Sequence, residues 1–141
     1  MRLLRILLVA STATALMATP ALAEKSTYNI TLSGAEEVPG PGDPDGTGTA
    51  VVTLDTDTNE LCWDIKVQNI GDPTAGHIHV GDAGKSGSVM VDLNLPANGL
   101  KACTAVDGKT MGHLSGGPKS HYLNIHTAEF PNGAVRGQLQ K

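Results

Sequence analysis

Apolar and polar residues alternate with a period of two along several short stretches of the chain. In Glu60–Asn69, the clearest of these stretches, apolar side chains occupy every second position. Such alternation is typical of β-strands with one buried face. Strands are predicted at Tyr28–Ser33, Thr47–Asp55, Glu60–Asn69, Ala75–Gly81, Ser88–Leu95, Leu100–Val106, Tyr122–Thr127 and Ala134–Gln140.

No stretch after residue 23 shows a helical period of 3.6, and the Gly-rich, polar segment Asp107–Ser120 is expected to be a loop. Seven or eight short strands separated by turn residues indicate an all-β protein. The predicted architecture is an antiparallel Greek-key β-sandwich or flattened barrel.

The first 23 residues have the pattern of a secretory signal peptide. Arg2 and Arg5 precede the apolar run Ile6–Met17, and Ala21–Ala23 is a small-x-small cleavage site. We therefore expect export to the periplasm or the extracellular space, with Glu24–Lys141 as one mature domain and no membrane insertion after cleavage.

The charge of this expected mature chain argues against nucleic-acid and anionic membrane partners. Loss of Arg2 and Arg5 leaves 8 basic and 14 acidic residues, a formal net charge of −6. With no basic cluster, the chain lacks the charge that phosphate backbones attract. One Trp, one Phe and two Tyr offer few stacking surfaces for bases or sugars.

Cys62 and Cys103 are the two cysteines of the chain. In an oxidising compartment they are expected to form one disulfide. The alternative, a pair of thiolate metal ligands, has no C-x-x-C spacing to support it.

Three histidines on two predicted strands form a candidate metal site. His77 and His79 alternate with Ile78 and therefore share a face, as two imidazoles that could reach one ion. His126 alternates with Ile125 in the same way. If the aliphatic residues face one core, all three imidazoles lie on the outer side of the sheet, where copper or zinc could bind.

Other residues could extend this site. Met90, Met111 and His113 are candidate extra ligands, and a thioether would favour Cu(I). His121 lies five residues before His126 and so faces the opposite way; we expect it to be exposed and uninvolved.

A structural alternative needs no metal. The histidines could hold backbone carbonyls of the Gly-rich turns, while Glu37 and Arg136 form an ion pair. In the metal hypothesis, Arg136 and Asn124 share the outer face and could orient ligands or neutralise a bound anion.

Three segments carry a family resemblance: Leu32–Pro39 (LSGAEEVP), Ala75–Gly81 (AGHIHVG) and Asn124–Leu139 (NIHTAEFPNGAVRGQL). Together they resemble the CHRD domain, named after the animal protein chordin and found in exported bacterial proteins. The animal domains occur in proteins that bind growth factors, which makes a protein partner one alternative, whereas for bacterial single-domain members the resemblance implies no settled activity. Asp107–Ser120 departs from it, being shorter and more Gly-rich than the helix-forming stretch expected there.

A strand-borne His-x-His with a disulfide on a Greek-key scaffold also resembles copper–zinc superoxide dismutase in architecture. No Ser-His-Asp, paired-carboxylate or Cys-His arrangement stands out in the sequence. We therefore expect a non-enzymatic protein that binds copper or zinc through His77, His79 and His126. The alternatives are a metal-free interaction module and a dismutase-like copper enzyme.

Overall fold

The computed structural model describes residues 25–140, and the predicted signal peptide at 1–23 lies outside them. Eight antiparallel strands form one sheet in the order β5-β4-β7-β8-β1-β2-β3-β6, which confirms the all-β prediction. The strands are β1 (Lys25–Ser33), β2 (Thr47–Asp55), β3 (Glu60–Gln68), β4 (Pro73–Val80), β5 (Val89–Asp92), β6 (Lys101–Ala105), β7 (His121–Thr127) and β8 (Val135–Gln138).

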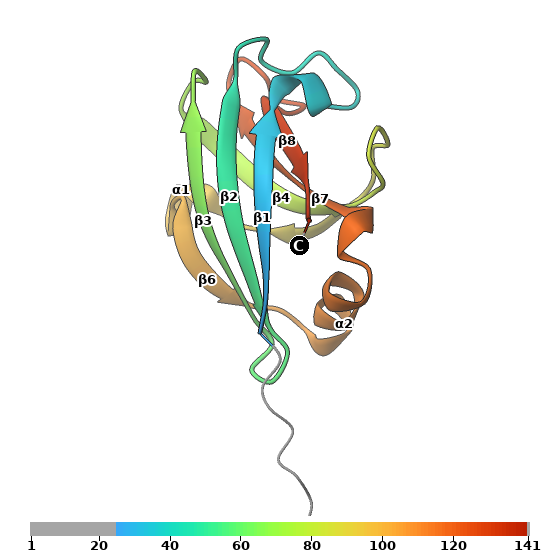
Figure 1. Ribbon diagram of the computed structural model, residues 1–141. Helices are drawn as coiled ribbons and strands as arrows, with labels where there is room; N and C mark the ends of the chain where they lie inside the picture. Colours follow the sequence, from blue (N-terminus) through green and yellow to red (C-terminus); the bar gives the residue numbers. More distant parts are fainter. Residues whose placement is uncertain (1–24, 141) are drawn as a thin grey trace, which may run out of the picture.

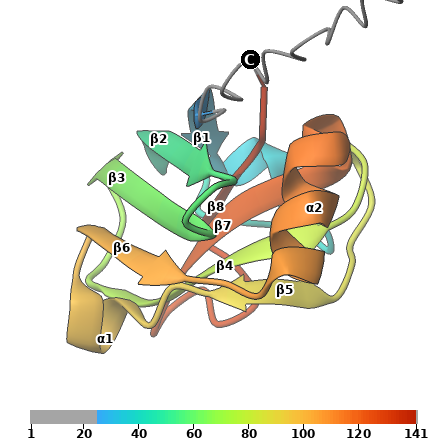
Figure 2. The ribbon, with the colours of Figure 1, turned by 90° about the horizontal axis from the view of Figure 1, so that it is seen from below.

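The sheet curls into a half-barrel, with β5 and β6 as its two edges (Figures 1 and 2). β1, β2 and β3 pair along their full lengths, whereas β8 joins β1 through the single pair Ser33–Arg136. Alternate apolar residues from both halves of the sheet fill one core. These residues include Leu32, Val52, Trp63, Ile78, Leu123 and Val135, all at most 2 % exposed.

The predicted loop at 107–120 is wrong, because α2 (Gly108–Gly116) occupies most of it. The carboxylate of Asp107 accepts hydrogen bonds from the backbone N–H groups of Lys109 and Thr110, and so caps the helix. Met111 and Leu114, three residues apart, are buried in the core. Burial of this short apolar face offsets the weak helix propensity of the glycines.

Three shorter helical turns complete the fold. These are η1 (Gly34–Glu36), α1 (Leu95–Asn98) and η2 (Pro118–Ser120). The predicted strand Ser88–Leu95 is shorter in the structure: β5 ends at Asp92, and α1 begins at Leu95. Among residues 25–140, no helix has the length and hydropathy needed to cross a bilayer.

Cys62 and Cys103 form the predicted disulfide. They are directly opposed on β3 and β6, so the bond crosses between neighbouring strands. Both sulfur atoms are therefore committed, and the thiolate-ligand alternative does not hold in this oxidised structure.

Candidate metal centre

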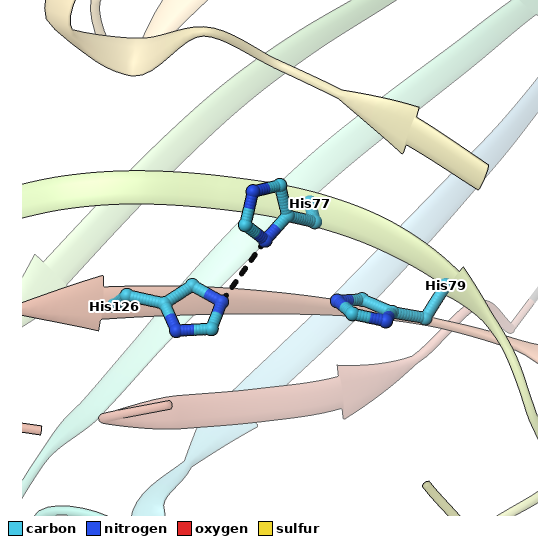
Figure 3. Close-up of side chains that lie close together, drawn as sticks. All are labelled: His77, His79 and His126. Carbon is cyan, nitrogen blue, oxygen red and sulfur yellow. Dashed lines mark hydrogen bonds between the residues drawn. The ribbon is translucent and has the colours of Figure 1, made fainter. Parts of the chain in front are cut away.

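His77, His79 and His126 converge as the strand pattern predicts (Figure 3). One ring nitrogen from each lies within 4.8 Å of those of the other two. The closest approach is 3.0 Å, between His77 Nδ1 and His126 Nε2. Two nitrogen ligands of a tetrahedral zinc ion, each about 2.0–2.1 Å from the metal, lie about 3.3–3.4 Å apart. The three rings thus need only small side-chain adjustments to share one ion.

The pairing of β4 with β7 brings these rings together. Ala75 lies opposite His126, His77 opposite Asn124, and His79 opposite Tyr122. Directly opposed residues project from the same face of a sheet, so the three histidines share one face while Ile78 and its neighbours fill the core.

This face is less open than the sequence predicts. His79 is only 8 % exposed, and His77 and His126 are half-buried. Two loops provide part of the cover. The Nδ1–H of His79 donates to the carbonyl of Gly87 at 2.9 Å, and that of His126 donates to the carbonyl of Pro131 at 2.9 Å. Strand alternation predicts the face of a side chain and not the loops that fold over it.

These two hydrogen bonds determine which nitrogen of each ring carries the proton. A carbonyl oxygen can only accept a hydrogen bond, so Nδ1 carries the proton in both His79 and His126. In a neutral ring, Nε2 then presents a lone pair to the centre of the cluster. Holding a histidine by its other nitrogen is the usual outer-shell arrangement of metal sites in proteins.

The electrostatics of the cluster favour neutral rings. Burial lowers the pKa of His77, and the neighbouring His126 and His79 lower it further, against an opposing effect of Asp92. Burial likewise lowers the pKa of His126. Asp92 Oδ1 lies 3.9 Å from His77 Nε2, beyond hydrogen-bond distance, so Asp92 acts on this ring through its charge. Neutral imidazole is the form that binds a metal.

A second group of buried polar residues lies beside the histidines. Arg136 is 1 % exposed, and its guanidinium carbon lies 3.4 Å from the centroid of the Tyr122 ring. Its Nη2 donates to the carbonyl of Asp82 at 3.0 Å and to Gln138 Oε1 at 3.1 Å. Asn124, the residue paired with Arg136, is 3 % exposed. Arg136 and Asn124 therefore share the face of the histidines, as predicted.

Glu37 is the acid of this polar group. It is 6 % exposed, and burial raises its pKa to about 7 against the lowering effects of the Arg136 charge and of hydrogen bonds from Val38 and Asn124. The Glu37–Arg136 ion pair of the structural alternative is not formed: in residues 25–140, ion pairs within 4.0 Å join Lys25 to Asp55 and Lys101 to Asp64, and Asp92 lies near the neutral ring of His77.

The other predicted participants lie elsewhere. Met111 is buried in the core, Met90 packs against the core, and His113 is exposed on α2. The prediction that His121 is exposed is wrong. It is 2 % exposed, because it faces the core side of β7, and its Nδ1–H donates to the carbonyl of Gly117 at 2.8 Å.

Sequence reasoning missed the groups that surround the rings. The carbonyls of Gly87 and Pro131 hold two of the rings by hydrogen bonds, and the carboxylate of Asp92 lies near the third. Backbone carbonyls carry no sequence signal, and Asp92 becomes a neighbour of His77 only through the pairing of β4 with β5. The one available signal was the alternation in Ser88–Leu95, which puts Asp92 on a polar face.

A family model supports the assignment of the fold. The model of the CHRD domain matches residues 28–139, which include all three histidines and, apart from the first three residues of β1, every strand described above. Neither a curated protein nor a solved structure matches the chain, so the likeness to copper–zinc superoxide dismutase stays without support. The match covers most of the chain, and the protein belongs to the CHRD-domain family.

Proposed function

We propose that this protein is an exported, non-enzymatic domain that binds one copper or zinc ion through His77, His79 and His126. The convergence of three ring nitrogens within 4.8 Å carries the proposal. Imidazole is a ligand suited to both metals. The lowered pKa values of His77 and His126 keep these rings available at neutral pH.

Export to the periplasm or the extracellular space is part of the proposal. It rests on the signal-peptide pattern in residues 1–23 and on the Cys62–Cys103 disulfide. Disulfides persist in oxidising compartments and are rare in the reducing cytosol. The mature domain would then be residues 24–141.

The test is a titration of tag-free, oxidised Glu24–Lys141 with Zn²⁺ and with Cu²⁺. Calorimetry measures the number of ions bound, and competition with a chelator measures the affinity. We expect one ion per chain, and loss of that binding in the His77→Ala/His79→Ala double variant. His113→Ala is the matched control, since His113 is exposed on α2 and outside the cluster.

Equal, weak uptake by all three proteins would overturn the proposal. The histidines would then serve only to anchor the loops, and the search for a function would turn to protein partners. An assay of superoxide consumption by the copper-loaded protein separates binding from dismutase-like catalysis. We expect no consumption above that of free Cu²⁺.

A further inference from the structure

The side chain of Asn124 lies among the inward-facing nitrogens of the cluster. Its Oδ1 is 3.1 Å from His79 Nε2 and 3.1 Å from His126 Nε2. Because the Nδ1 atoms of both rings carry the protons, these Nε2 atoms are acceptors in the neutral rings. An amide oxygen is also an acceptor. Three acceptors therefore meet at hydrogen-bond distance, and His77 Nδ1–H can supply one proton to His126 Nε2 but none to His79 Nε2 or Asn124 Oδ1.

Three arrangements would satisfy these acceptors: a cation among them, an additional proton on one Nε2 that makes its ring cationic, or an inverted Asn124 amide with its NH₂ group between the two rings. The surroundings favour the orientation in the structure. A hydrogen bond from the Asn124 side chain is one of the causes that lower the pKa of Glu37, and only the amide NH₂ group can donate it. Inversion would take this donor away from the ionised form of Glu37, which predominates above a pKa of about 7.

We propose that Asn124 Oδ1 is the fourth ligand of the site, which therefore takes a divalent copper or zinc ion in an N₃O donor set in preference to Cu(I). This inference rests on the metal-binding function proposed above. His77 binds through Nδ1, and His79 and His126 bind through Nε2. Glu37 is a positioning residue that keeps the amide oxygen turned toward the ion.

The spacing of the four atoms supports the assignment. Three of the six separations among these atoms are short: 3.0 Å for His77 Nδ1–His126 Nε2 and 3.1 Å for each of the two contacts of Asn124 Oδ1. These values are close to the edge of about 3.3–3.4 Å expected for a tetrahedral ion. Without the amide oxygen, the three rings alone would form a three-nitrogen site that could also bind Cu(I).

The chemistry of the donors points the same way. Soft thioether and thiolate ligands select Cu(I), whereas imidazole and oxygen ligands suit divalent ions. Met111 lies in the core, Met90 packs against the core, and both cysteine sulfurs are in the disulfide. The acidic groups nearby, Glu37 beyond Asn124 and Asp92 beyond His77, complement a dipositive charge.

The test compares Zn²⁺, Cu²⁺ and Cu(I) affinities of the oxidised protein with those of Asn124→Ala and Asn124→Asp, by competition with chelators of known affinity. Asn29→Ala, an exposed Asn on β1, is the control. In Asn124→Ala we expect at least about tenfold weaker Zn²⁺ and Cu²⁺ binding. Its Cu(I) affinity should stay within about threefold, and Asn124→Asp should tighten Zn²⁺ binding.

Unchanged or tighter Zn²⁺ binding by Asn124→Ala would overturn the inference, because it would show that the amide donates to the rings and competes with the ion. If Asn124→Ala does not fold, two other measurements test whether Asn124 is a ligand. Zn²⁺ must shift the ¹⁵N resonance of the Asn124 side-chain amide in wild-type protein, and it must bind Asn124→Asp more tightly than wild-type protein. Wild-type protein that binds no metal would instead refute the proposed function itself.

Discussion

Glu37 is an acid that the fold keeps away from water. The backbone of Gly133, at φ +137°, comes so close that a Cβ atom at this position would lie 2.4 Å from the Glu37 carboxyl carbon. The positive φ favours glycine here, and a larger side chain would also have to displace the end of Glu37. The enclosure raises the pKa of Glu37 to about 7. Ionising this side chain therefore opposes folding.

This cost predicts a pH-dependent effect of Glu37→Gln. Below pH 4.5 the carboxyl group is protonated in both the folded and the unfolded chain, and its stabilising contribution is fully present. As the pH rises from 4.5 to about 7, the unfolded chain ionises first and the contribution is lost. A shift of this size is worth about 3 kcal/mol. Denaturant unfolding at several pH values should show wild-type protein losing that much relative to Glu37→Gln.

The control for this experiment is Glu36→Gln, because Glu36 is the exposed neighbour of Glu37. Its free energy of unfolding should follow that of wild-type protein at every pH. A Glu37→Gln difference that stays constant between pH 4.5 and 8 would show that Glu37 titrates normally in the folded protein.

The histidine cluster predicts a second pH dependence, that of metal binding. Burial lowers the pKa values of His77 and His126 below 6.5, so protons compete with the metal only in more acidic solution. The apparent affinity for Zn²⁺ should fall as the pH drops, and the part of the fall due to His77 and His126 should be steepest below pH 6.5. Competition titrations at half-unit steps measure this, and a fall that is steepest above pH 7 would contradict the lowered pKa values.

At this scale the sequence predicts which face a side chain takes and not what covers that face. Alternation assigned His77, His79 and His126 correctly to one face. It also put His121 on the opposite face, but its predicted exposure is wrong because that face is the core. The covering atoms come from loops and from α2, whose positions depend on the whole fold.

Among the elements, β8 and β1 approach each other closely at Gly137. A Cβ atom at Gly137 would lie 2.1 Å from the carbonyl oxygen of Thr31 and 2.6 Å from Ile30 Cγ2. Backbone and a β-branched side chain cannot yield easily, so Gly137→Ala should destabilise the protein by about 1–3 kcal/mol in thermal or denaturant unfolding.

Gly112 offers the matched substitution. It lies on α2 with open space where a Cβ atom would be added. Because alanine favours helix over glycine by up to about 1 kcal/mol, Gly112→Ala should be neutral or stabilising. Equal effects of the two substitutions would show that the contact between β1 and β8 is looser than described.

The same helix shows why one element escaped sequence analysis. The stretch Gly108–Gly116 contains three glycines, and only Met111 and Leu114 form its apolar face. Two apolar residues are too few to show a helical period. The N-cap at Asp107 was the readable signal, and tertiary packing of the two apolar side chains supplies the rest.

Across the whole molecule, the site depends on strands that are distant in sequence. One row of directly opposed residues crosses five strands: Asp92, His77, Asn124, Arg136 and Ser33. The sequence could suggest each member from its own strand. The order of strands in the sheet, which makes them neighbours, follows from long-range packing and has no local sequence signature.

This arrangement predicts that metal binding stabilises the entire fold. An ion held by His77, His79 and His126 links β4 to β7 and, through Gly87 and Pro131, to two loops. A ligand that binds only the folded state, at 100 times its dissociation constant, adds about 2.7 kcal/mol to the free energy of unfolding.

Zn²⁺ should therefore raise the melting temperature of wild-type protein in a concentration-dependent way, and a chelator should reverse the rise. His77→Ala/His79→Ala should melt at one temperature with or without Zn²⁺. A Zn²⁺-dependent rise of the same size in that variant would place the stabilising ion at another site.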